Sequence, residues 1–507
     1  MARVYSNRIS EYSHENGGRV LLLFLLFLLA IYEFVTAGFS AFTITCLLPA
    51  AVLFVYAAFR WRMLTFWTLI VVNYFLQFKE ITLPVPMSLP NEMLQIILLS
   101  IAIIDARQTP HFERSVNLML FALIVWCGFC TLEILNDTCG LGINISAWYG
   151  GARMMAFQFI YIFLVFSIYI SSPQTLMRYL FLWAGLSLFS VFWTWKQQHI
   201  GFTQAEAHFL EGSRTHILMG GTLIRYFSTF SDAANYGCNA AATAVAFIII
   251  GITNQVRRSK LFFILAGIAV IWGMFQSGTR TAIACLGAGL IVYIFLSKSF
   301  KIAVPFTIAF VFLAFILAFT TIGQGNQQIR RMRSAFNKND ASANVRDINQ
   351  QTMKKYIKDA PWGIGLGLNY KNVPANNKYN VLATIPPDSE YVFIWLRTGP
   401  IGITVFILTM LMMLGGACYT VLFKLKNKSL MGIGAALCCS FVAIQLGGYG
   451  NQVLMQFPNG LIFYGGLSMV YILPYIEPEW IEYEKKLLAK QEERKRLKLE
   501  KKLASRV

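Results

Sequence analysis

Long apolar runs separated by short polar connections constrain this chain more than any other feature of its sequence. Hydropathy predicts roughly fourteen runs of about the length that crosses a bilayer as a helix. They are predicted at 20–36, 39–59, 62–78, 92–105, 115–134, 151–171, 177–195, 232–252, 260–276, 280–297, 302–321, 399–423, 429–447 and 459–475. Only 13% of the 507 residues are charged, about half the share of an ordinary soluble domain. The expected fold class is therefore all-α, a polytopic integral membrane protein with roughly 12–14 transmembrane helices.

Positive charge in the connections predicts which side of the membrane each one faces. With the N-terminus inside, every second connection is cytoplasmic, and each of these carries Lys or Arg, as expected for that side. They are the segments 60–62, 105–114, 171–178, 253–260, 297–301 and 424–429. The tail after Glu477 falls on the same side and is predicted to form a polar helix near the inner leaflet. The membrane thus accounts for the net charge of +19, and no nucleic-acid partner is expected.

The alternation of runs and connections divides the chain into five segments. They are a cytoplasmic N-terminal tail (1–19), about eleven spans (20–321), a large outer loop (322–388), about three more spans (389–475) and a basic cytoplasmic tail (476–507). A second long outer segment covers 196–231. Connections of this length in a compact fold usually carry function. No internal repeat is present, which weighs against transporters built from two related halves.

Five arginines lie on the predicted outer side, where the charge rule does not favour them. They are Arg153, Arg225, Arg280, Arg346 and Arg397. For any one of them, a long side chain that reaches the headgroup region is about as good an explanation as a binding role. For all five together a bound anion explains more, because guanidinium groups hold phosphate oxygens in pairs and stay charged at any working pH.

The end of the large loop offers two carboxylates. The segment Pro-Asp-Ser-Glu predicts a helix start with Asp388 as N-cap and Glu390 in the first turn. Capping is compatible with a second role, since a carboxylate near arginines can accept the proton of a sugar hydroxyl. Earlier in the loop, a surface helix is predicted over 344–358 and flexible glycine-rich backbone over 363–367. No cluster has metal-ligand spacing, so neither a metal nor a cofactor is expected.

The order of these segments resembles that of the O-antigen ligase and O-antigen polymerase superfamily. FSTFSDAANYG, SGTR, the Arg346 helix followed by PWGIGLG, and DSEYVFIWLRTGPIG carry the resemblance, which covers about residues 220–425. It implies a GT-C-like glycosyltransferase with one large periplasmic loop and a periplasmic active site, in the bacterial inner membrane with both termini cytoplasmic. It also implies that Arg225, Arg280 and Arg346, with Arg153 as a fourth, bind the diphosphate of an undecaprenyl-diphosphate-linked glycan.

At Asp388, ligases of that family carry a histidine. This difference favours a polymerase, which extends a growing polysaccharide of O-antigen, capsule or exopolysaccharide, over a ligase that moves glycan to lipid A-core or to protein. The base remains open among Asp388, Glu390 and a histidine of the other long outer segment, His208 or His216. A polysaccharide flippase is the alternative from another class, but it should show two similar halves and short loops on both faces. A solute transporter should place ionisable residues near mid-membrane.

Overall fold

The computed structural model describes residues 17–81, 88–104, 112–212, 224–297 and 341–504, and residues 304–333 in part. These ranges contain helices and no strand, as the all-α prediction requires. The chain divides into two units, Met1–Thr65 and Phe66–Val507. Helix α2 (Gly17–Arg60) makes up the first unit, where the sequence predicted two spans. It has 44 residues, a length of about 66 Å that is roughly twice the thickness of the hydrocarbon core, so the two spans stay a prediction.

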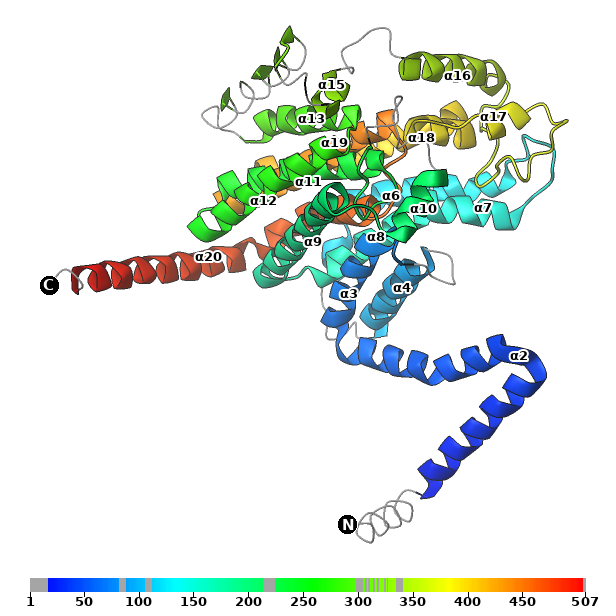
Figure 1. The fold of residues 1–507 in the computed structure, drawn as a ribbon, viewed down its shortest axis with the longest axis horizontal. Coiled ribbons are helices and arrows are strands. Elements are labelled where there is room, and N and C mark those ends of the chain that lie inside the picture. Colours follow the sequence, from blue (N-terminus) through cyan, green and yellow to red (C-terminus); the bar gives the residue numbers. More distant parts are fainter. Residues whose placement is uncertain are drawn as a thin grey trace. The chain divides into compact units, whose positions relative to one another are not determined.

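Helices form most of the described part of the second unit (Figure 1). Counting α3, which begins at the boundary, they are α3 (Arg62–Phe75), α4 (Ser88–Ile104), α5 (Phe112–Ser115), α6 (Leu118–Leu132), α7 (Ile145–Ala152), α8 (Gln158–Tyr169), α9 (Pro173–His199), α10 (Gln204–Gly212), α11 (Ala233–Thr253), α12 (Arg257–Gln276), α13 (Arg280–Leu296), α15 (Gln327–Arg333), α16 (Ala341–Ile357), α17 (Asn380–Thr384), α18 (Glu390–Tyr419), α19 (Lys428–Gly450) and α20 (Gly465–Ala504). Short 3-10 or π turns (Glu133–Leu135, Arg153–Phe157, Thr420–Lys424 and Gly460–Tyr464) extend four of the spans.

The described helices agree with a protein that crosses the membrane many times. Eight of them are long and apolar enough to do so, or nine if Val52–Arg60 and Arg62–Phe75 count as one span. Two shorter apolar helices of the second unit, α4 and α13, also coincide with predicted spans. The span predicted at 302–321 lies largely outside the described residues.

Helix α11 lies against α12, α13 and α19 in the second unit (Figure 1). A Cβ atom on Gly251 of α11 or on Gly267 of α12 would overlap an isoleucine of the facing helix. In a bilayer helices associate through such close packing, because lipid tails are as apolar as leucine. The packing brings the first turns of α11 and α13 together, where the Thr279 hydroxyl donates to the Ala233 carbonyl at 2.7 Å.

Connections predicted to be cytoplasmic lie together at the opposite end of this unit. The Arg114 guanidinium donates to the Ser171 carbonyl at 3.4 Å. The backbone amides of Lys426 and Asn427 donate to the Glu477 carboxylate. These three contacts join four segments that the charge rule assigned to one side, so the predicted alternation agrees with the geometry.

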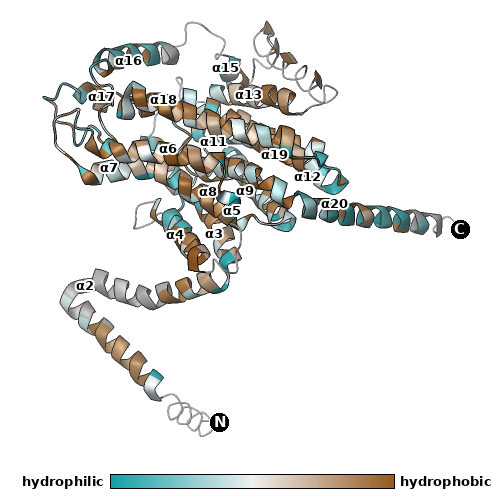
Figure 2. Ribbon diagram, turned by 180° about the vertical axis from the view of Figure 1, so that it is seen from behind, coloured by the Kyte–Doolittle hydropathy of each residue, from teal (hydrophilic) through white to brown (hydrophobic). Residues whose placement is uncertain are grey.

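The basic tail continues the last span as one helix. Helix α20 ends at Ala504 without a break, and its second half is hydrophilic (Figure 2). The Arg257 amide, at the start of α12, donates to the Gln491 side chain of this half at 2.9 Å. The helix predicted for the tail is therefore present.

The large outer loop is folded around an apolar cluster of its own. Its buried members are Cys139, Met353, Ile357, Ala360, Ile364, Leu368, Val373, Leu382 and Leu396. Cys139 comes from the connection between α6 and α7, and Leu396 comes from α18, so the cluster ties the loop to two spans. Helix α16 confirms the helix predicted over 344–358, and Figure 2 shows that many of its residues are hydrophilic.

The glycines at 363–367 serve close packing, and the prediction of flexible backbone there was wrong. Two amides of this stretch donate to the carbonyls of Leu396 and Arg397, at 2.9 and 3.0 Å. Gly399, with φ of 67°, is non-helical and is followed by Pro400, so α18 is kinked at this point. The loop therefore docks on the kink through backbone hydrogen bonds.

Replacing Gly367 with Ala should destabilise the folded protein by roughly 3 kcal/mol or more. Gly367 has φ of 77°, and a Cβ there would overlap the Ala147 carbonyl of α7. Gly142→Ala is the matched control, because Gly142 has φ of 75° and open space around it. Its cost should be the backbone strain alone, about 1 kcal/mol. Thermal unfolding of the purified protein in detergent measures both, and equal losses would contradict the close-packing role.

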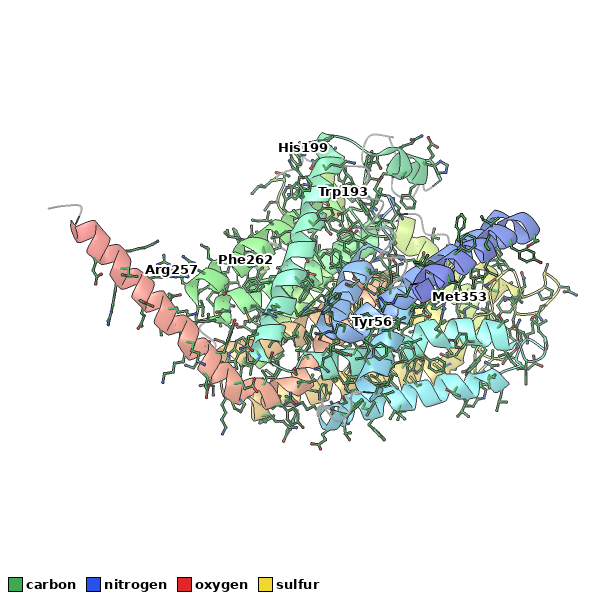
Figure 3. All side chains as sticks on the ribbon, turned by 90° about the horizontal axis from the view of Figure 1, so that it is seen from below. Tyr56, Trp193, His199, Arg257, Phe262 and Met353 are labelled. Carbon is green, nitrogen blue, oxygen red and sulfur yellow. The ribbon has the colours of Figure 1, made fainter. Side chains whose placement is uncertain are left out.

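One buried carboxylate organises the second long outer segment. Glu206 of α10 accepts hydrogen bonds from the side chains of Trp193, Gln197 and Lys196 and from the Thr203 amide, at 2.7, 2.7, 3.2 and 2.9 Å. Figure 3 shows Trp193 near one end of α9. Burial by itself would raise the pKa of Glu206, but the hydrogen bonds outweigh it and the pKa lies below its ordinary value.

Glu206→Gln should cost about 2 kcal/mol of stability at pH 7, since it removes charge-assisted hydrogen bonds. A lowered pKa in the folded state means that the ionised carboxylate stabilises the protein above the unfolded pKa. That contribution is lost as the pH falls through the lower, folded pKa. The difference in melting temperature between wild type and variant should therefore be constant near pH 7 and shrink below about pH 4. A difference that stays the same in acid would contradict this role.

Candidate active site

Arg225 is held just before α11, at the end of the bundle that is predicted to face outward. Its Nε donates to the Ser277 carbonyl at 3.3 Å, and its Nη2 donates to the Thr279 hydroxyl at 3.1 Å. Both partners belong to the short turn between α12 and α13. Burial lowers the pKa of Arg225, and the positive charges of Arg280 and Arg346 lower it further, against the opposing effect of Asp232. Arg280 and Arg346, the other two arginines predicted to bind diphosphate, therefore each lie close enough to Arg225 for their charge to act on it.

Arg280 is the first residue of α13, whose helix dipole places partial positive charge at the same point. The Thr279 side chain does not cap this helix, because it is engaged by Ala233 and Arg225. Arg331 of α15 reaches the same turn, where its Nε donates to the Gly278 carbonyl at 3.1 Å. The guanidinium groups of Arg225 and Arg331 thus bind the turn that the SGTR motif predicted, and Arg280 belongs to that motif.

Arg346 of α16 faces a carboxylate at the start of α18. Its Nε lies 3.8 Å from Oδ2 of Asp388, and both side chains are more than one third exposed. Ser389, not Asp388, occupies the N-cap position of α18, so the prediction of an Asp388 cap was wrong. The Ser389 hydroxyl donates to the Gly448 carbonyl at 3.1 Å. The Asp388 carboxylate is therefore accessible and lies beside an arginine of the cluster.

Glu390 has a different environment from Asp388, although both were predicted as catalytic. It lies in the first turn of α18, as expected, and is 3% exposed. Its Oε2 accepts the Leu454 amide at 3.0 Å, with the amides of Val453 and Met455 beside it. This carboxylate joins α18 to the connection between α19 and α20. The geometry suits a positioning role, and a catalytic role for Glu390 stays a prediction.

Arg153 and Arg397 are not brought into the cluster by any of their recorded contacts. Arg153 pairs with Glu92 of α4 at 3.2 Å and donates to the Ser88 hydroxyl at 3.1 Å. Arg397 is buried in α18, 5.3 Å from the ring centre of Phe393. Arg153 thus has a carboxylate of its own, which leaves its predicted role as a fourth diphosphate ligand unsupported by its contacts.

His208, one of the two histidines considered as alternative bases, does not join the site either. His208 is 89% exposed and lies 3.6 Å from the Glu211 carboxylate, on the surface of α10. His216 lies outside the described residues.

Sequence reasoning missed Lys79, a cation that lies close to Asp232. The Lys79 ammonium donates to the Ser231 carbonyl at 3.0 Å and lies 3.8 Å from the ring centre of Phe209. Asp232 caps α11 and affects the pKa of both Arg225 and Lys79. Lys79 directly follows the predicted span 62–78 on the outer side, so the sidedness argument that selected the arginines would have found it.

A concentration of positive charge beside one accessible carboxylate suits transfer chemistry on an anionic substrate. Guanidinium groups and a helix N-terminus stabilise negative charge that develops on a phosphate leaving group. A carboxylate within reach of the incoming hydroxyl can accept its proton. The described contacts supply both elements at one end of the helix bundle.

A family model described as O-Antigen ligase matches residues 265–407 of this chain. The matched segment contains Arg280, Arg346, Asp388 and Glu390, whereas Arg225 and Arg153 lie outside it. No curated protein matches the chain. The many apolar helices indicate a multi-pass membrane protein, and residues 265–407 of it are similar to the O-antigen ligase family. The match supports that superfamily as the family of the chain, in agreement with the resemblance found in its sequence.

Proposed function

We propose that the protein is a glycosyltransferase that uses an undecaprenyl-diphosphate-linked oligosaccharide at the periplasmic face of the membrane. The observation that carries this proposal is the closeness of Arg280 and Arg346 to Arg225, with Asp388 3.8 Å from Arg346. Three like charges held close together repel one another, so the arrangement is stabilised by a bound polyanion. A diphosphate provides the charge and the oxygens for bidentate contacts.

In the proposed reaction, a hydroxyl oxygen of the acceptor sugar attacks the anomeric carbon of the donor. The bond from that carbon to the diphosphate oxygen breaks, and the lipid diphosphate leaves with the electron pair. The arginines stabilise the negative charge on the leaving oxygen, and Asp388 accepts the proton of the attacking hydroxyl. Glu390 holds the start of α18 through its bond to the Leu454 amide, and thereby positions Asp388.

The acceptor we assign is the growing polysaccharide, because a carboxylate stands at position 388 where ligases of the family carry histidine. A ligase that transfers glycan to lipid A-core, or to protein, is the second candidate, and the similarity of residues 265–407 to the O-antigen ligase family favours it.

Deletion of the gene distinguishes the two acceptors. Loss of a polymerase should leave surface polysaccharide with single repeat units, whereas loss of a ligase should leave long chains on the carrier lipid. Electrophoresis of surface polysaccharide and mass spectrometry of extracted carrier lipid measure the two products. Unchanged chain length and unchanged carrier lipid would contradict both candidates.

A further inference from the structure

A groove lies at the predicted cytoplasmic end of the bundle, and none of the residues that line it belongs to the candidate active site. It has a volume of about 650 Å³ and is lined by the start of α6, the end of α18 and the first turns of α20. Its polar side chains include Arg114, Asn117 and Lys424, with Tyr419 and Tyr475 at its margins. None of the residues that line the groove, all of them in the described part of the chain, is acidic.

The cations of the groove are arranged around tyrosine rings. The Arg114 guanidinium lies 5.5 Å from the ring centre of Tyr475, and the Lys424 ammonium lies 6.0 Å from that of Tyr419. Both rings are more than half exposed, as is usual for tyrosines at the headgroup level of a membrane. The first turn of α6, capped by Asn117, adds the positive end of a helix dipole. The field in the groove therefore favours an anion.

Glycines leave room for an apolar group in the membrane-facing part of the same groove. A Cβ on Gly415 would meet nothing within 4 Å, so this position opens onto free space. On the next residue, Gly416, a Cβ would overlap the Tyr471 hydroxyl, which donates to the Met413 carbonyl at 2.6 Å. The Tyr471 ring therefore forms a fixed wall, and Gly415 leaves the opening beside it. Cations at one end and an apolar opening at the other complement an amphiphile with an anionic head.

We propose that this groove binds an anionic phospholipid of the inner leaflet, with its phosphate between Arg114 and Lys424 and its first acyl carbons beside Gly415. Charge complementarity selects the anionic headgroup. The position of the groove, between connections that share one end of the bundle, selects a lipid over a soluble phosphate. Lys424 lines this groove, and Lys426, two residues later, lines a second groove of about 630 Å³ beside α13. The second lysine places further positive charge at the same end of the bundle.

Native mass spectrometry of the full-length protein tests the proposal. The protein is released from micelles containing equal amounts of phosphatidylglycerol and phosphatidylcholine with the same acyl chains. The wild type should retain phosphatidylglycerol in preference. Gly415→Leu should abolish this preference, because the new side chain fills the opening while both cations remain. Leucine also replaces glycine within a helix, which favours folding.

A charge variant and its control complete the experiment. Arg114→Gln combined with Lys424→Gln should weaken phosphatidylglycerol binding roughly 30-fold, since each basic residue near a membrane surface contributes about a factor of five. Arg258→Gln removes one exposed cation at the start of α12, outside the groove, and should leave the preference unchanged. A preference that survives both groove variants overturns the proposal. So does displacement of the lipid by glycerol phosphate, which would identify the ligand as a soluble phosphate.

Discussion

Replacing Arg280 with Lys is expected to lower the rate of glycan transfer about 100-fold, the size of effect seen when one donor that stabilises a developing anion is removed. Lysine keeps the positive charge but has a single ammonium in place of the planar fork that binds two phosphate oxygens at once. The charge around Arg225 would remain, so the fold of the turn between α12 and α13 should be preserved. Transfer from a purified lipid-linked oligosaccharide donor, followed by gel analysis of the product, measures the rate.

Arg330→Lys is the matched control for this change. Arg330 is an exposed arginine of α15, next to the residue that contacts the turn. Its replacement should change the rate less than twofold. Near-normal transfer by the Arg280 variant, or an equal loss in both variants, would contradict bidentate binding of phosphate at Arg280.

Asp388→Asn is expected to lower transfer by a factor of roughly 10² to 10⁴, the range contributed by a general base. The amide has the size of the carboxylate but cannot accept the proton of the attacking hydroxyl. The fold should tolerate it, because Asp388 is exposed and Ser389 occupies the N-cap position. Donor binding should change little, so kcat should fall while KM stays within a few fold.

The neighbouring carboxylate of α16 supplies the control. Asp347 follows Arg346 in sequence, is exposed, and accepts a hydrogen bond from Gln351 at 2.8 Å. Asp347→Asn should leave both constants close to those of the wild type. Full activity of the Asp388 variant would show that Asp388 has only a structural role. The general base would then have to be one of the remaining candidates.

Hydropathy and charge predicted most of the described helices of the second unit because lipid leaves the backbone few choices. A segment that crosses hydrocarbon must satisfy its own peptide groups, so long apolar runs become helices. The kink of α18 at Gly399 could be predicted from the Gly-Pro pair in the sequence. The segment that packs against the kink could not. The stretch 363–367 docks there through contacts over more than 30 residues, and periodicity carries no information about contacts of that range.

In the candidate site, too, local sequence patterns could be predicted, whereas contacts between residues distant in the sequence could not. Asp and Ser are about equally common at the N-cap position, so the pattern around Asp388 could not decide which of the two residues would occupy it. The bond from Ser389 to Gly448 depends on a helix about 60 residues away. In the same way, Glu92 pairs with Arg153 across 61 residues, and nothing near either residue in the sequence indicates it. Sidedness grouped five arginines as candidates, and only the contacts in the fold distinguish Arg153 and Arg397 from the other three.

Equilibrium binding of undecaprenyl diphosphate to the full-length protein in detergent tests the central claim most directly. The account predicts that Arg225→Gln, Arg280→Gln and Arg346→Gln each weaken binding roughly tenfold or more, since each loses a charge-assisted contact. It also predicts that the wild type binds undecaprenyl phosphate, which lacks one phosphate group, more weakly than the diphosphate. Equal affinity for the two lipids, together with unchanged binding by the three variants, would contradict a diphosphate site formed by these arginines.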